Sequence, residues 1–151
     1  QIEKDYAGEE LLVVGILKGA SVFCADLIRE IDLDVRMDFM VVSSYGNETS
    51  SSGTVKIIKD LDVDIENKNV LIVEDIIDSG LTLSSLVAAL ETRKPKSLKL
   101  CTLLDKPERR TADIKVDYVG YVIEDKFIVG YGIDFAEKYR NLPYIGIVED
   151  I

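Results

Sequence analysis

The residues from Glu74 to Thr82, EDIIDSGLT, combine acids, hydroxyls and a glycine in an order that suits a phosphorylated ligand. The carboxylates of Glu74 and Asp75 can accept hydrogen bonds from a vicinal diol or hold a divalent metal ion. Gly80 lets the backbone approach a ligand closely, and Ser79 and Thr82 add hydroxyl donors. A ligand that carries both a phosphate and a diol, such as a ribose 5-phosphate, fits this combination.

The elements on either side of this stretch must position it. Residues 69–74 form an apolar run that ends in an acid, which is typical of a buried strand. A helix is expected next, because apolar residues recur at helical spacing at Leu83, Leu86, Val87 and Leu90. The first turn of a helix has unpaired backbone N–H groups and a partial positive charge, which favour a phosphate. Alternatively, Asp78 or Ser79 only caps this helix. Capping does not explain three acids at the end of an apolar strand, where desolvation is unfavourable.

Composition restricts the chemistry further. The chain has no histidine, which excludes Ser–His–Asp and Cys–His catalysis and the common zinc sites. A general base must then be a carboxylate, a lysine or a tyrosine, and any metal is expected to be a hard cation on oxygen ligands, Mg²⁺ first. No GxxxxGK[ST] motif occurs, so a P-loop NTPase is not expected.

Length and charge favour one globular domain over residues 1–151. The 151 residues are 47% hydrophobic, enough for a sizeable core. The 28 acidic and 18 basic residues give a net charge of −10, which disfavours a general nucleic-acid binder. With no apolar run of membrane-spanning length and no visible signal peptide, we expect a cytoplasmic protein without membrane contact. Cys24 and Cys101 lie in apolar segments and are expected to be buried free thiols.

The order of the remaining segments predicts an α/β fold with a mostly parallel central sheet flanked by helices. Strands are expected at 10–17, 35–45, 54–61, 69–74, 97–104, 118–123, 127–132 and 144–148, with helices at 20–31 and 83–90. The polar residues 46–53 are expected to form the tip of a mobile hairpin. Ligands bind at the carboxyl ends of parallel strands, where residues 17–19, 74–82 and 104–106 should share one crevice.

At this point the sequence resembles a known family. VLIVEDIIDSGLT at 70–82 is similar to the phosphoribosyl-diphosphate signature of type I phosphoribosyltransferases. Four more segments resemble the hypoxanthine-guanine phosphoribosyltransferases of bacterial type, in that family's order: LKGA at 17–20, SSYG at 43–46, LLDKPERR at 103–110 and DKFIVGYGID at 125–134. The last segment narrows the resemblance to enzymes of 6-oxopurines.

The resemblance implies a purine salvage reaction. Phosphoribose passes from phosphoribosyl diphosphate to N9 of hypoxanthine or guanine, giving IMP or GMP and pyrophosphate. Two alternatives stay open: an enzyme for xanthine or another purine, and a non-catalytic nucleotide-binding regulator with the same fold. The resemblance also implies a homodimer or homotetramer, a small hood and a flexible hairpin loop.

The resemblance further implies roles around the signature. Glu74 and Asp75 bind the ribose hydroxyls with Mg²⁺ nearby, and Asp78 is the general base at purine N7. The 5-phosphate loop consists of Asp78, Ser79, Gly80, Leu81 and Thr82. Lys18, Gly19 and Arg140 bind the pyrophosphate, and the family has a cis peptide bond between the residues that match Leu17 and Lys18.

Other residues are implied at the base and at the metal. Lys106 donates a hydrogen bond to the purine 6-oxo group, Phe127 stacks on the base, and Ile128 binds the purine edge through its backbone. Asp134 reaches Mg²⁺. Ser44 and Tyr45 begin the loop that closes over the site.

The chain departs from the family pattern in three places. Ser79 stands where threonine is usual, which keeps the hydroxyl, and Leu81 stands where some members carry lysine. The sequence begins at Gln1, whereas family members usually have a strand and a helix before this point. Either the sequence is trimmed at this end, or part of the hood over the purine is expected to be absent.

Overall fold

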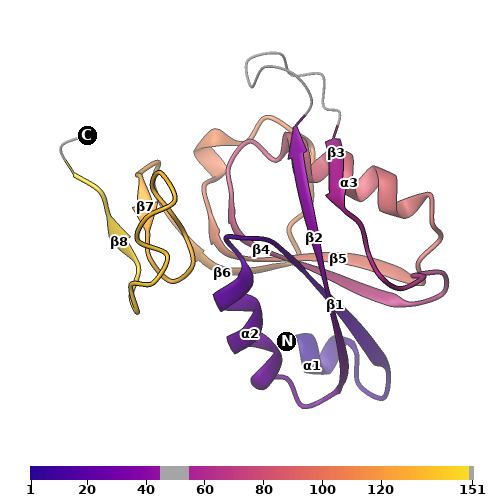
Figure 1. Cartoon of the computed structure of the whole chain (residues 1–151). Coiled ribbons are helices and arrows are strands. Elements are labelled where there is room, and N and C mark those ends of the chain that lie inside the picture. Colours follow the sequence, from indigo (N-terminus) through magenta and orange to yellow (C-terminus); the bar gives the residue numbers. More distant parts are fainter. Residues whose placement is uncertain (45–54, 150–151) are drawn as a thin grey trace.

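The computed structural model describes residues 1–44 and 55–149. Its main sheet has six strands in the order β3-β2-β1-β4-β5-β6 (Figure 1). All neighbouring strands are parallel except β2 and β3, which are antiparallel. The strands are β1 (Glu10–Ile16), β2 (Asp34–Ser44), β3 (Val55–Lys59), β4 (Asn69–Ile77), β5 (Ser97–Asp105) and β6 (Tyr118–Val122). The predicted α/β fold class is confirmed.

Helices cover both faces of this sheet. Helix α3 (Leu81–Glu91) lies on one side, and α1 (Ile2–Asp5) and α2 (Ser21–Arg29) lie on the other (Figure 1). A 3-10 helix, η1 (Pro107–Arg109), follows β5, and a separate two-stranded sheet pairs β7 (Ile128–Val129) with β8 (Gly146–Ile147). No helix in the described part of the chain is long and apolar enough to cross a membrane.

The central strands are apolar along their length because both of their faces are buried. Successive side chains of a strand point to opposite faces. In β1, Leu12 and Val14 pack with the leucines of α3, whereas Leu11 and Val13 pack with Cys24 of α2. Cys24 and Cys101 are buried free thiols, as predicted, and burial raises the pKa of Cys24 to about 11.

The predicted end of β4 was wrong. The strand was expected to stop at Glu74, but it continues to Ile77 because Ile76 and Ile77 pair with Leu104 and Asp105 of β5. The acids Glu74 and Asp75 are therefore part of the strand and do not follow it. The strands expected at 127–132 and 144–148 shorten to two residues each, and α1 was not predicted.

The strand order brings the predicted loops together. Strands β1, β4 and β5 are consecutive and parallel, so residues 17–19, 78–80 and 106 follow them at the same edge of the sheet. Strands β2 and β3 are the two arms of the expected hairpin, and the expected tip at 46–53 lies outside the described residues.

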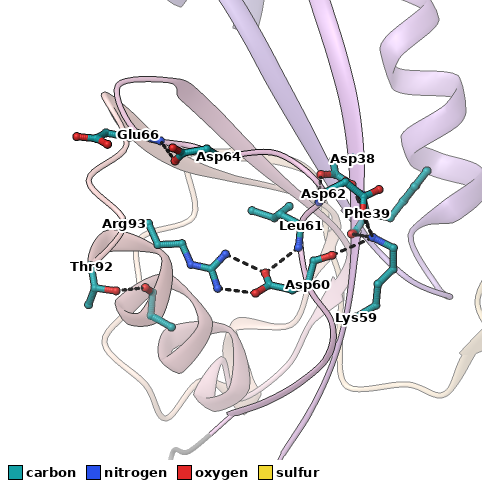
Figure 2. A network of polar contacts seen from close by, with 11 residues as sticks. Asp38, Phe39, Lys59, Asp60, Leu61, Asp62, Asp64, Glu66, Thr92 and Arg93 are labelled. Carbon is teal, nitrogen blue, oxygen red and sulfur yellow. Dashed lines mark hydrogen bonds and ion pairs between the residues drawn. The ribbon is translucent and has the colours of Figure 1, made fainter.

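A polar network fastens the returning arm of this hairpin (Figure 2). The Asp60 carboxylate accepts two hydrogen bonds of 2.8 Å from the guanidinium of Arg93, two residues after the end of α3, and this lowers the pKa of Asp60. Lys59 Nζ donates to the Asp60 carbonyl at 2.9 Å, and the buried Asp38 carboxylate accepts from the backbone N–H of Asp62 at 2.8 Å. The segment that leaves β3 is thus attached to both β2 and α3.

Candidate active site

The predicted phosphate loop joins β4 to α3 at the carboxyl edge of the sheet. Gly80 is the N-cap residue and has φ 79°, a left-handed conformation that glycine adopts readily. Neither Asp78 nor Ser79 occupies the cap position, although Ser79 Oγ accepts a hydrogen bond from the Leu81 N–H at 3.3 Å. A pocket of about 190 Å³ is lined by Glu74 and residues 76–83. Capping alone therefore does not account for the acids.

The connection after β5 holds this loop from outside. The Arg110 guanidinium pairs with the Asp105 carboxylate and donates through Nε to the Asp78 carbonyl at 3.1 Å. The next two backbone N–H groups, at 111 and 112, both donate to the Ser79 carbonyl at 3.0 Å. Arg110 was not singled out from the sequence, because nothing in its spacing indicates this contact with a loop 32 residues earlier.

Lys106 lies against this loop and is only 8% exposed. Its Nζ is 3.7 Å from Asp78 Oδ1 and 3.5 Å from Asp125 Oδ1. Asp125 also pairs with Arg109 at 3.3 Å. A lone lysine is ordinarily a solvated charge, so burial between two carboxylates marks Lys106 as unusual. Asp125 was missed as a site residue in the sequence.

Phe127 and Ile128 enter the small sheet from the segment after β6. Phe127 is 62% exposed, and its ring meets Phe135 edge-on at a centroid distance of 6.4 Å. Ile128 is the first residue of β7. An exposed aromatic face in this position is available for stacking.

Gly19 brings the loop after β1 into direct contact with the acids of β4. The Leu17–Lys18 peptide bond is cis. A Cβ placed on Gly19 would lie 2.8 Å from Cγ of Asp75 and would overlap its Oδ2. A Cβ on Gly132 would lie 2.8 Å from the Gly19 carbonyl oxygen. Three segments distant in sequence therefore meet with no room for additional atoms.

The cations predicted for the pyrophosphate share an acid that was missed in the sequence. Lys18 Nζ lies 3.0 Å from Glu137 Oε2, and an Arg140 nitrogen, Nη2, lies 3.2 Å from Glu137 Oε1. Arg140 also pairs with Asp134 at 3.4 Å and donates to the Gly132 carbonyl at 2.8 Å. A mixture of acids and bases, as in 134–140, is common on solvated surfaces, so the sequence carried no signal for Glu137.

The acids of β4 are held in an unfavourable environment. Burial, and then the charge of Asp75, raise the pKa of Glu74 well above its ordinary value. Burial also raises the pKa of Asp75, whereas the backbone N–H of Ile76 and the charge of Arg140 lower it and Asp134 raises it. Within residues 1–44 and 55–149, no three metal-ligating side chains gather closely enough to hold a metal ion by themselves.

Of the two residues predicted to begin the closing loop, the structure describes only one. Ser44 is the exposed last residue of β2, and Tyr45 lies outside the described residues. The last five residues of the sequence, 147–151, repeat the IVEDI of residues 72–76, and Glu149 in this second copy is exposed.

Comparison with known proteins gives consistent relatives. A family model described as "Phosphoribosyl transferase domain" matches residues 1–136. The hypoxanthine-guanine phosphoribosyltransferase of Bacillus subtilis (strain 168) is 59% identical, with 99% of this chain and 83% of that protein covered. The enzyme of that name from Staphylococcus aureus (strain Mu50) is 56% identical with the same coverage.

A solved structure agrees. The hypoxanthine-guanine phosphoribosyltransferase from Bacillus anthracis, with a HEPES molecule in its active site, has a TM-score of 0.94 and 61% identity. The match covers 98% of this chain and 87% of that one. The signature loop, the sheet order and these relatives agree, and the chain belongs to the phosphoribosyltransferase family, in its hypoxanthine-guanine phosphoribosyltransferase branch.

Proposed function

We propose that this chain transfers phosphoribose from phosphoribosyl diphosphate to N9 of hypoxanthine or guanine and releases pyrophosphate. The products are IMP and GMP, so the reaction serves purine salvage. The observation that carries the proposal is the position of Lys106, a buried ammonium 3.7 Å from the Asp78 carboxylate and next to a loop that suits a phosphate. Together they offer a hydrogen-bond donor and a base beside the 5-phosphate of a nucleotide.

The base end combines Asp78 and Lys106. Asp78 takes the proton from purine N7 as N9 attacks the ribose. Lys106 donates to the 6-oxo group, and it rejects adenine because a 6-amino group would present a donor to a donor. Burial strengthens this discrimination, since a buried donor without a partner is costly. Phe127 stacks on the ring, and the Ile128 backbone binds the purine edge.

The phosphoribose end uses backbone amides and hydroxyls. Ser79, Gly80, Leu81 and Thr82 bind the 5-phosphate at the N-terminus of α3. Glu74 and Asp75 accept hydrogen bonds from the ribose diol. Lys18 and Arg140 stabilise charge that develops on the leaving pyrophosphate in the transition state.

Mg²⁺ fits the donor set. The acids offered are Glu74, Asp75 and Asp134, all oxygen donors, and they do not form a complete cage. This arrangement suits Mg²⁺, which keeps several waters and binds through one or two carboxylates together with substrate phosphates. When bound, the ion would neutralise charge on the diphosphate. The cation would also relieve the unfavourable burial of Glu74 and Asp75.

Replacing Asp78 tests the base. We expect Asp78→Asn to lower turnover roughly 10²- to 10⁴-fold because proton transfer from N7 is lost. Binding of phosphoribosyl diphosphate should change only a few-fold, since the loop contacts are mainly backbone. Steady-state rates and calorimetry on the same preparations check this. Equal losses in turnover and binding would contradict a base role.

Replacing Lys106 tests purine recognition. In a panel of hypoxanthine, guanine, xanthine and adenine, Lys106→Met should raise KM for the accepted 6-oxopurines roughly ten- to hundredfold, as expected for the loss of a charged hydrogen bond. Lys115→Met is the matched control, because its side chain is 88% exposed and lies in the loop before β6. Unchanged kinetics for hypoxanthine and guanine would refute the role of Lys106 in purine recognition. A preference of the unaltered chain for xanthine would favour the alternative of a xanthine phosphoribosyltransferase.

The raised pKa of Glu74 predicts that removing its charge stabilises the fold at neutral pH. A raised folded pKa means that the stability Glu74 contributes is fully present below its ordinary value of 4.5 and is lost as pH rises through the folded value. Without metal, Glu74→Gln should therefore be more stable than the parent at pH 7, and not at pH 4. Urea unfolding at both pH values measures this. The control Glu91→Gln, on the exposed end of α3, should show no such difference; equal destabilisation by Glu74→Gln at both pH values would contradict the argument.

Replacing Gly19 tests whether activity needs the close contact between its backbone and the Asp75 carboxylate. In Gly19→Ala the new methyl group overlaps the carboxylate, so the loop or the acid must move. We expect turnover to fall on the order of 10²-fold, as for a displacement of about 1 Å near reacting groups. Gly146→Ala is the control, because no atom lies within 4 Å of its added Cβ. Full activity in Gly19→Ala would show that this contact does not matter.

A further inference from the structure

Glu137 places one carboxylate oxygen on each of the two cations assigned to the pyrophosphate. Oε2 lies 3.0 Å from Lys18 Nζ, and Oε1 lies 3.2 Å from Arg140 Nη2. Carboxylate and phosphate oxygens make the same kind of charge-assisted hydrogen bond with lysine and arginine. Glu137 therefore satisfies both cations in the way that two oxygens of a diphosphate would.

The backbone around Glu137 is fixed, whereas its side chain is exposed. The Glu137 N–H donates to Asp134 Oδ2 at 2.9 Å, and Phe135 and Lys138 exchange two backbone hydrogen bonds of 3.0 Å. The side chains of Lys18 and Glu137 are 69% and 65% exposed, so the carboxylate can swing into solvent without disturbing the turn. Exposed ion pairs of this kind are weak and exchange partners readily.

We propose that Glu137 is an internal anion that occupies the cation pair Lys18–Arg140 when the site is empty and competes there with pyrophosphate. The inference rests on the proposed function, which assigns these two cations to pyrophosphate. Binding of the diphosphate exchanges one set of ion pairs for another, and the return of Glu137 promotes release of the product. Product release limits turnover in many enzymes, so an internal carboxylate that competes with pyrophosphate would speed turnover by promoting its release.

The charge state of Glu137 agrees with this role. The ammonium of Lys18, and then the guanidinium of Arg140, lower the pKa of Glu137. The carboxylate therefore stays ionised at neutral pH. Asp134 is engaged elsewhere: its Oδ2 accepts the Glu137 N–H, and its Oδ1 lies 3.4 Å from Arg140.

The test is binding of Mg²⁺-pyrophosphate to the full chain by calorimetry. Most substitutions at a ligand site weaken binding, but Glu137→Gln should tighten it, roughly two- to tenfold, the range expected from removing one or two competing exposed ion pairs. Glu91→Gln removes the same charge at the opposite end of α3, where Glu91 has no ion pair within the part of the chain that the structure describes. It should leave the affinity unchanged.

A second background makes the test specific to Lys18. Lys18→Met should weaken binding, and adding Glu137→Gln to Lys18→Met should recover less affinity than Glu137→Gln gains alone. Unchanged or weaker binding in Glu137→Gln overturns the inference, as does an equal gain in Glu91→Gln or an undiminished gain in the Lys18→Met background. If the unaltered chain does not bind Mg²⁺-pyrophosphate, the proposed function fails as well, so the two failures are distinguishable.

Discussion

The candidate active site depends on two carboxylates, those of Glu74 and Asp75, in a strand whose other residues are mostly buried. Glu74 and Asp75 lie between apolar residues of β4, and burial raises the pKa of both. Such acids weaken the fold when no cation balances them. They are tolerated because the rest of the strand is apolar and paired on both sides, by β1 and β5. Local instability is thus concentrated where the proposed cation and sugar would relieve it, and the well-packed sheet supports the strand that carries the two acids.

The loops around these acids are shaped by the same constraint. Gly19 has no side chain, so the Asp75 carboxylate can lie directly against its backbone. The charge of Arg140 lowers the pKa of Asp75 and partly offsets the effect of burial. On the other side, Arg110 and the backbone at 111 and 112 hold the Asp78–Gly80 loop by its carbonyl groups, which leaves the N-terminus of α3 open. Each of these contacts fixes a backbone segment or a charge near the carboxylates of Glu74 and Asp75 without occupying the carboxylates themselves.

Most of the fold was predictable because apolar runs and helical spacing report burial directly. What failed was decided by partners distant in sequence. The end of β4 was misplaced because the pairing of Ile76 and Ile77 depends on β5. Spacing alone gave no sign that Lys106 is buried, because the acid beside it, Asp125, comes nineteen residues later. The roles at the pyrophosphate came from the family resemblance, and Glu137 escaped notice because its pairing with Lys18 spans 119 residues.

In the proposed function, the acidic chain accepts an anionic substrate by exchanging one set of ion pairs for another. Its site cations are already neutralised: Lys18 by Glu137, Arg140 by Asp134 and Glu137, and Lys106 by Asp78 and Asp125. The pairs differ in exposure, however. Lys106 is enclosed, so under the proposed function a 6-amino group would set a donor against a desolvated ammonium at high cost, whereas Lys18 is mostly in solvent, where exchange of one anion for another costs little. Under the proposed function, burial therefore assigns selectivity to the purine end and easy release to the pyrophosphate end, with the same kind of ion pair at both.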